Sequence, residues 1–211
     1  MGRHSALTSS FRFAWDGLVD GAVRDRNLRI QLGLGALAGA FGALAPLVPA
    51  ERAVLVLCAA AVIGAEARNS ALESAVDLAS PGLDERARFA KDAAAGSVLA
   101  LSAGSVLAFL AIAVPHAPEL LAWARALPPG AAVVRATAAL AASLAAGWLP
   151  APWRRPVAAD VLLAATGAAG ILLLAVSAES QVGTTVAALC LAVGAAGAGR
   201  RRRIEPGHHS S

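Results

Sequence analysis

Long apolar stretches dominate the chain and are separated by short polar segments. A helix needs about 20 apolar residues to cross a hydrocarbon core of about 30 Å, and stretches of this kind recur along the whole sequence. The expected spans are residues 30–48, 53–75, 93–114, 132–149, 157–177 and 182–199. Glycine interrupts the first span repeatedly, which is tolerated where membrane helices pack closely. The pattern predicts an all-α fold, a polytopic membrane bundle of about six transmembrane helices.

A different pattern precedes the first span. In residues 5–26, apolar side chains such as Phe11, Trp15 and Val19 recur at helical spacing among charged residues. Such an amphipathic helix is expected to lie in the membrane interface, and it lacks the features of a cleaved signal peptide. The predicted organisation is an interfacial helix (1–27), a three-span core (28–114), a linker (115–131), three further spans (132–199) and a basic tail (200–211).

Composition and charge agree with a membrane location. Only 15% of the residues are charged, whereas a soluble domain carries about 25%. With six spans and a cytoplasmic N-terminus, most of the 18 cations fall on the cytoplasmic side, as the positive-inside bias requires. Aromatic residues, at 4% of the chain, are too few to suggest base stacking. We therefore expect a multi-pass protein of the cell membrane, with both termini cytoplasmic, and no nucleic-acid partner.

Polar residues form a stripe at the end of the second span. Glu66, Asn69, Glu73 and Asp77 are three or four residues apart, so they share one face of a helix. An ionisable residue deep in a span costs about 2.5 to 3.5 kcal/mol and usually faces protein or a water-filled cavity. The stripe is therefore a candidate functional site.

Two structural explanations compete with this interpretation. The helix could simply leave the bilayer here, so that Asp77 is solvated. Arg68 could instead neutralise an acid on a neighbouring helix, although it points about 200° away from Glu66. Neither explains Glu66 well, because it directly follows the apolar residues 62–65.

The stripe also carries a family resemblance. The run Glu66-Ala-Arg-Asn-Ser-Ala-Leu-Glu-Ser-Ala-Val-Asp77, followed by Ala90-Lys-Asp-Ala-Ala-Ala-Gly96, resembles the signature of the small integral-membrane prokaryotic diacylglycerol kinase and undecaprenol kinase family. Residues 10–17 and 25–30 are similar to the surface helix of that family and its entry into the first span. The resemblance covers about residues 8–114 and implies an enzyme, an ATP:lipid-alcohol phosphotransferase.

The resemblance implies a role for each polar residue. Phosphoryl transfer needs a metal, a cation on the phosphates and a group that orients the attacking hydroxyl. Glu66 would be the general base, and Glu73 would bind Mg²⁺ together with Asp25, where the family commonly has glutamate. The residues that would bind the co-substrate ATP are Asn69, Asp77, Lys91 and Asp92. Lys91 is the single lysine of the chain, and most arginines are expected only to set its orientation in the membrane.

The resemblance also suggests a substrate and an assembly. The segment Asp25-Arg-Asn-Leu-Arg-Ile30 is more similar to the undecaprenol kinase branch, so undecaprenol is the expected substrate and diacylglycerol the alternative. A non-catalytic membrane scaffold derived from the family is a second alternative. A homotrimer with shared sites is implied. Residues 115–211 lie outside the resemblance and are expected to be packing helices, with Asp160 and Glu179 solvated near span ends.

Overall fold

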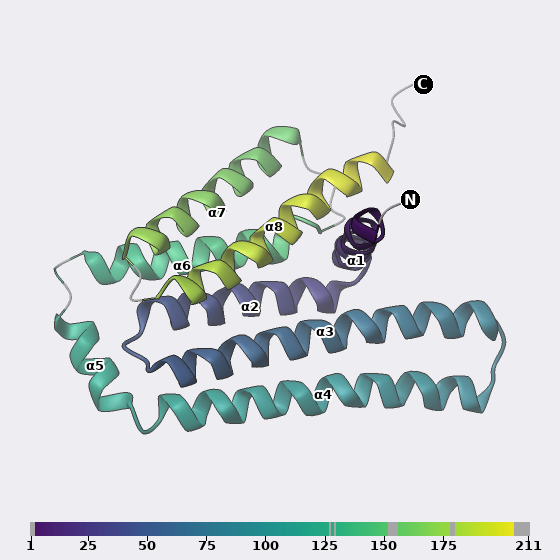
Figure 1. The fold of residues 1–211 in the computed structure, drawn as a ribbon, viewed down its shortest axis with the longest axis horizontal. Helices are drawn as coiled ribbons and strands as arrows, with labels where there is room; N and C mark the ends of the chain where they lie inside the picture. The colour runs from purple at the N-terminus through teal and green to yellow at the C-terminus, as the bar shows by residue number, and fades with distance from the viewer. Residues whose placement is uncertain (1–2, 127, 129, 152–155, 178–179, 205–211) are drawn as a thin grey trace.

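The computed structural model describes residues 3–126, 128, 130–151, 156–177 and 180–204 (Figure 1). This part of the chain is helical and contains no strand, which confirms the all-α prediction. Its helices are α1 (Arg3–Arg24), α2 (Arg26–Leu44), α3 (Pro49–Ala79), α4 (Glu85–Ala113), α5 (Ala117–Ala126), α6 (Ala131–Trp148), α7 (Val157–Ser177) and α8 (Gln181–Ile204).

Helix α2 lies at the centre of the bundle. The long hairpin of α3 and α4 runs along one side of α2, whereas α6 and α8 cover the other side, with α7 outside them (Figure 1). Helix α1 crosses the end of the bundle where α2 begins. Helix α4 packs mainly on α3, and only 6% of its most apolar segment is buried. The face of α4 is therefore left for lipid or a partner chain.

Glycines let α2 approach its neighbours closely. A Cβ on Gly39 would lie 2.7 Å from the backbone oxygen of Gly183 in α8, and a Cβ on Gly33 would lie 3.3 Å from the backbone oxygen of Ser143 in α6. The Ser143 hydroxyl also donates to the Gly33 carbonyl at 2.7 Å. These contacts confirm that the glycines of the first predicted span serve helix packing.

Replacing Gly183 by alanine is expected to lower the free energy of unfolding by about 1 to 3 kcal/mol. The new methyl group would overlap backbone atoms of Gly39 and Ala43, which cannot rotate away. Thermal unfolding in detergent micelles measures the change. Gly104→Ala is the matched control, because nothing lies within 4 Å of a Cβ on Gly104 in α4. Equal unfolding temperatures for the two variants would contradict the close α2–α8 contact.

Three helices of the described chain are long and apolar enough to cross a membrane. They are Glu85–Ala113, Val157–Val176 and Gln181–Arg203, with mean hydropathies of 2.0, 2.1 and 1.7. They contain the predicted spans 93–114, 157–177 and 182–199 almost entirely. The other three predicted spans each fall largely on one helix, α2, α3 or α6, and their crossing of the membrane stays a prediction.

The first predicted span, 30–48, is displaced in the structure. Helix α2 begins at Arg26 and ends at Leu44. It begins early because the Asp25 carboxylate accepts a hydrogen bond from the Asn27 backbone N–H and caps the helix. It ends early because Pro46 disfavours helical geometry in the preceding residue. The start of α2 is therefore set by Asp25 and its end by Pro46.

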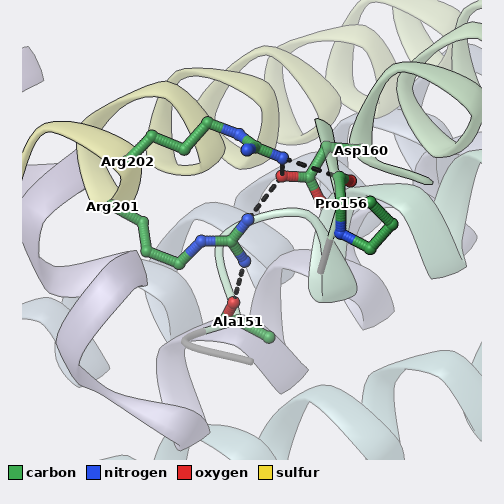
Figure 2. A network of polar contacts seen from close by, with 5 residues as sticks. All are labelled: Ala151, Pro156, Asp160, Arg201 and Arg202. Atoms are coloured by element: carbon green, nitrogen blue, oxygen red, sulfur yellow. Dashed lines mark hydrogen bonds and ion pairs between the residues drawn. The ribbon is translucent and has the colours of Figure 1, made fainter. Parts of the chain in front are cut away.

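The prediction that Asp160 is solvated was wrong. Asp160 is only 6% exposed, and its carboxylate accepts hydrogen bonds from Arg201 and Arg202 at the end of α8 (Figure 2). Arg201 is itself buried and also donates to the carbonyl of Ala151 (Figure 2). A buried carboxylate requires such partners. Glu179 lies outside the described residues.

The terminal arginines also do more than set orientation. Arg200 binds the Asp20 carboxylate of α1 through Nε at 2.7 Å and Nη2 at 3.0 Å. These hydrogen bonds hold the pKa of Asp20 below its ordinary value. A second acid, Asp16, lies 3.6 Å from Arg200 Nη1. The arginine run therefore ties α8 to both α1 and α7, which corrects the expectation that any cation would serve there.

Candidate functional site

The polar stripe of α3 turns toward α2 at its inner end. Glu66 and Asn69 are 2% and 7% exposed, whereas Arg68 is exposed on the other side of the helix. Glu73 and Asp77, further along α3, are exposed. The helical spacing therefore predicted correctly that Glu66 and Arg68 lie on different sides of α3. Glu66, the most buried acid of the stripe, lies beside the N-terminal end of α2.

Asp25 joins the two helices at this point. Its Oδ1 accepts the Asn27 backbone N–H at 2.7 Å, and its Oδ2 accepts a hydrogen bond from the Ser70 hydroxyl of α3. Both carboxylate oxygens thus have a donor, one local and one 45 residues away. The acid at position 25 is fixed against the stripe by these bonds.

Glu66 lies among polar and like-charged groups. Asp25, Asn27 and Glu73 are close enough to interact with it electrostatically. The Asn69 amide nitrogen donates to Glu73 Oε1 at 3.0 Å. Within the described part of the chain, the buried atoms Glu66 Oε1 and Asn69 Oδ1 have no hydrogen-bond partner. Two buried acceptors are therefore available for a donor or a cation from outside the chain.

A cavity of about 270 Å³ opens beside these acceptors. Asn27, Glu66 and Asn69 form its polar end, and Val98, Leu99 and Ser102 of α4 form much of the opposite wall. Gln31 and Ser102 add further polar groups to the lining, and Ile30, Val98 and Leu99 supply its larger apolar side chains. A mixed lining of this kind suits a ligand that joins a hydroxyl to a hydrocarbon chain.

A second group of charges lies at the turn of the α3–α4 hairpin. The Lys91 ammonium binds the Asp77 carboxylate, and both residues line a cavity of about 580 Å³ that also includes Arg88. Their side chains are 35% and 67% exposed. Cations at an open cavity can receive anionic groups such as phosphates. The structure thus brings Lys91 and Asp77 together, 14 residues apart in sequence.

Asp92 is the predicted site residue that these groups do not include. Its carboxylate accepts a hydrogen bond from Arg88 on its own helix at 2.9 Å, and 63% of its side chain is exposed. Asp92 does not line either cavity. A nucleotide role for this residue stays a prediction.

The carboxylates allow a test of the predicted magnesium site. Among the described residues, no group of three or more His, Cys, Asp or Glu side chains is placed to hold a metal ion. Mg²⁺ commonly takes only one or two carboxylates and completes its ligands with water and substrate phosphates. Asp25 and Glu73, which both interact electrostatically with Glu66, have the carboxylate chemistry that such a site uses, and their binding of Mg²⁺ stays a prediction.

Three polar residues at these places were not predicted from the sequence. Asn27 and Ser70 contact the buried acids, and Arg88 lines the hairpin cavity. Ser70 follows Glu66 by four residues, so its position on the same face was a usable signal. Asn27 lies on another helix, and its contact with Glu66 depends on tertiary packing.

Comparisons with known proteins cover the same part of the chain. Residues 12–113 match the family model described as Prokaryotic diacylglycerol kinase. A diacylglycerol kinase of Synechocystis sp. is 38% identical over 102 residues, which are 48% of this chain and 58% of that relative. The chain therefore spans somewhat more than half the length of this curated relative.

No solved structure matches the chain. The matched segment includes the second half of α1 and the whole of α2, α3 and α4, and thus every predicted site residue. Helices α5 to α8 lie outside it. Residues 12–113 are therefore similar to the prokaryotic diacylglycerol kinase family.

Proposed function

We propose that the protein is a lipid kinase that transfers the γ-phosphoryl group of ATP to the hydroxyl group of a membrane lipid. The observation that carries this proposal is the buried Glu66 Oε1, which has no hydrogen-bond partner among the described residues, in a cavity lined by both polar and apolar side chains. The family that residues 12–113 match supports the same reaction.

Glu66 is the proposed general base. In the cavity, its unpaired oxygen would accept the hydrogen bond of the lipid hydroxyl and take its proton as the oxygen attacks the γ-phosphorus. The bond from that phosphorus to the bridging oxygen of ADP then breaks. Asn27 and Asn69 lie beside Glu66 at the polar end of the cavity and would keep the hydroxyl in position.

The nucleotide would lie toward the hairpin turn. Lys91 would exchange Asp77 for the phosphates of ATP, because a phosphate is a stronger anionic partner than one carboxylate. A bound Mg²⁺ would neutralise charge on the transferred phosphoryl group. Asp25 and Glu73 would hold that ion.

Two lipid alcohols are the candidate substrates. The name of the Synechocystis relative favours diacylglycerol, and the segment at residues 25–30 favours undecaprenol. The test measures transfer of labelled phosphate from ATP to each lipid in mixed micelles, with purified full-length protein and Mg²⁺. Phosphorylation of either lipid supports the kinase, and the preferred lipid identifies the substrate. The absence of any lipid product would favour the non-catalytic scaffold.

The membrane topology and the assembly are also part of the proposal. Both termini are placed in the cytoplasm by the arginine distribution, where ATP is available. The largely unburied α4 is compatible with a homotrimer in which neighbouring chains cover this face. Crosslinking in native membranes measures the number of subunits.

Changing Lys91 to arginine is expected to lower kcat/KM for ATP about ten- to a hundredfold, the effect of losing one hydrogen bond to a charged group. The compact ammonium fits a phosphate and the hairpin cavity, whereas the wider guanidinium changes the contact geometry. The phosphate-transfer assay at varied ATP concentration measures the effect. Arg86→Lys is the control, since exposed Arg86 does not line the cavity. Unchanged kinetics for Lys91→Arg would reduce Lys91 to a charge that only sets topology.

A further inference from the structure

A groove of about 600 Å³ runs between α2 and α6, away from the cavities described above. Helix α2 belongs to the family segment, whereas α6 lies outside it. At the floor of the groove, the Ser143 hydroxyl donates to the Gly33 carbonyl at 2.7 Å, and Gly147 lies against the Arg29 backbone. The groove therefore exists only because the C-terminal helices are present.

One end of the groove is cationic. Arg26 and Arg29, in the first turn of α2, both line it. Arg29 donates through Nη1 to the carbonyls of Ala22 and Val23 at 3.3 and 3.0 Å. These carbonyls belong to the last turn of α1, which has no helical donors for them. In the described chain, all the side-chain hydrogen bonds of Arg29 leave from Nη1, so Nε and Nη2 remain available to a ligand.

Asp25 interacts electrostatically with Arg29, but it does not line the groove. Among the described residues that line it, none is an aspartate or a glutamate. The neighbouring acid, Asp25, uses both oxygens for the Asn27 N–H and the Ser70 hydroxyl on the α3 side. The exposed Arg26 side chain has no ion pair in the described structure. The cationic end is therefore complementary to an anion.

The walls beyond this end are apolar. Ile30 and Leu34 of α2 are 46% and 54% exposed, and Leu144 and Trp148 of α6 are 46% and 48% exposed. All four line the groove. A tryptophan beside an ionic rim, with aliphatic side chains further along the helices, is the arrangement found where a chain meets the lipid headgroup level.

We infer that the α2–α6 groove is a binding site for an anionic phospholipid. The phosphate would lie against Arg26 and Arg29, and one acyl chain would lie between Leu34 and Leu144. A soluble anion would leave the apolar walls uncovered, and a neutral lipid would leave Arg26 and the Nε and Nη2 atoms of Arg29 without an anionic partner. Only Ile30 is shared with the cavity at Glu66, so the bound lipid is distinct from the lipid that would be phosphorylated.

Quenching of tryptophan fluorescence by brominated lipids tests this site without ATP. The purified full-length protein is placed in phosphatidylcholine vesicles, and a fraction of the lipid is replaced by dibrominated phosphatidylglycerol or dibrominated phosphatidylcholine. The quenching of Trp148 is obtained as the difference in quenched fluorescence between the unmodified protein and the Trp148→Phe variant. Dibrominated phosphatidylglycerol is expected to give the same quenching of Trp148 at a concentration about fivefold lower than dibrominated phosphatidylcholine. This ratio is the gain in affinity from one basic residue near the membrane surface.

Variants separate this site from general attraction to anionic lipid. Arg26→Glu is expected to abolish the preference, whereas Arg86→Glu, the same reversal on exposed Arg86 of α4, retains it. Leu34→Phe narrows the groove without a change of charge and is expected to weaken quenching by the anionic lipid. Equal quenching by both lipids in the unmodified protein overturns the inference. A preference that survives Arg26→Glu, or that remains in the Trp148→Phe protein, overturns it as well.

Discussion

Replacing Glu66 by glutamine is expected to lower kcat of phosphate transfer about 10²- to 10⁴-fold, the usual contribution of a general base. Glutamine keeps the size of the side chain and can still form hydrogen bonds through its amide group, but it cannot take a proton from the lipid hydroxyl. The effect should fall on kcat more than on KM, because the hydroxyl is still bound in the cavity. The phosphate-transfer assay with the preferred lipid measures both constants.

Glu51→Gln is the matched control for this variant. Glu51 lies on the same helix, near its start, and accepts the Val48 backbone N–H at 2.9 Å. Glutamine can retain that hydrogen bond, so turnover is expected to stay near that of the unmodified protein. Equal turnover for Glu66→Gln and Glu51→Gln would falsify the assignment of the base and leave the proposed kinase without its catalytic carboxylate.

The position of Glu66 could be predicted because it depends on local geometry. Helical periodicity alone puts Glu66 and Asn69 on one face and Arg68 on another, and the apolar residues before Glu66 indicate burial. The helices themselves follow the hydrophobic pattern in the same way. Asn27 could not be assigned to the site from the sequence, because its contact depends on how α2 packs against α3.

The C-terminal half shows where this reasoning fails. Asp160 lies near the start of a predicted span, where an acid is ordinarily solvated. Its partner Arg201 is 41 residues away in sequence, so no local spacing indicates the pair. The run of arginines at residues 200–203 gives a strong topological signal, which conceals the fact that individual members are buried and paired.

Replacing Asp160 by asparagine is expected to lower the free energy of unfolding by about 3 to 5 kcal/mol, the usual effect of breaking a buried ion pair from one side. Arg201 would remain buried, with the Ala151 carbonyl but without a carboxylate. Arg202 would lose its bond to the same acid. Thermal and denaturant unfolding in micelles, followed by circular dichroism, measures the loss.

Asp20→Asn provides the matched comparison, because the arginine partners of Asp20 and Asp160 both lie at the C-terminal end of α8. It removes the acid that Arg200 contacts, but the two side chains are 33% and 36% exposed. Exposed pairs contribute about 0.2 to 1 kcal/mol, so Asp20→Asn should destabilise far less than Asp160→Asn. The double variant Asp160→Leu with Arg201→Met should recover most of the loss, because it leaves no buried unpaired charge; Arg202, which also loses its acid, is 32% exposed. If Asp160→Asn is as mild as Asp20→Asn, then Arg201 reaches water or lipid headgroups in the membrane, and the α7–α8 pair does not hold the C-terminal helices together.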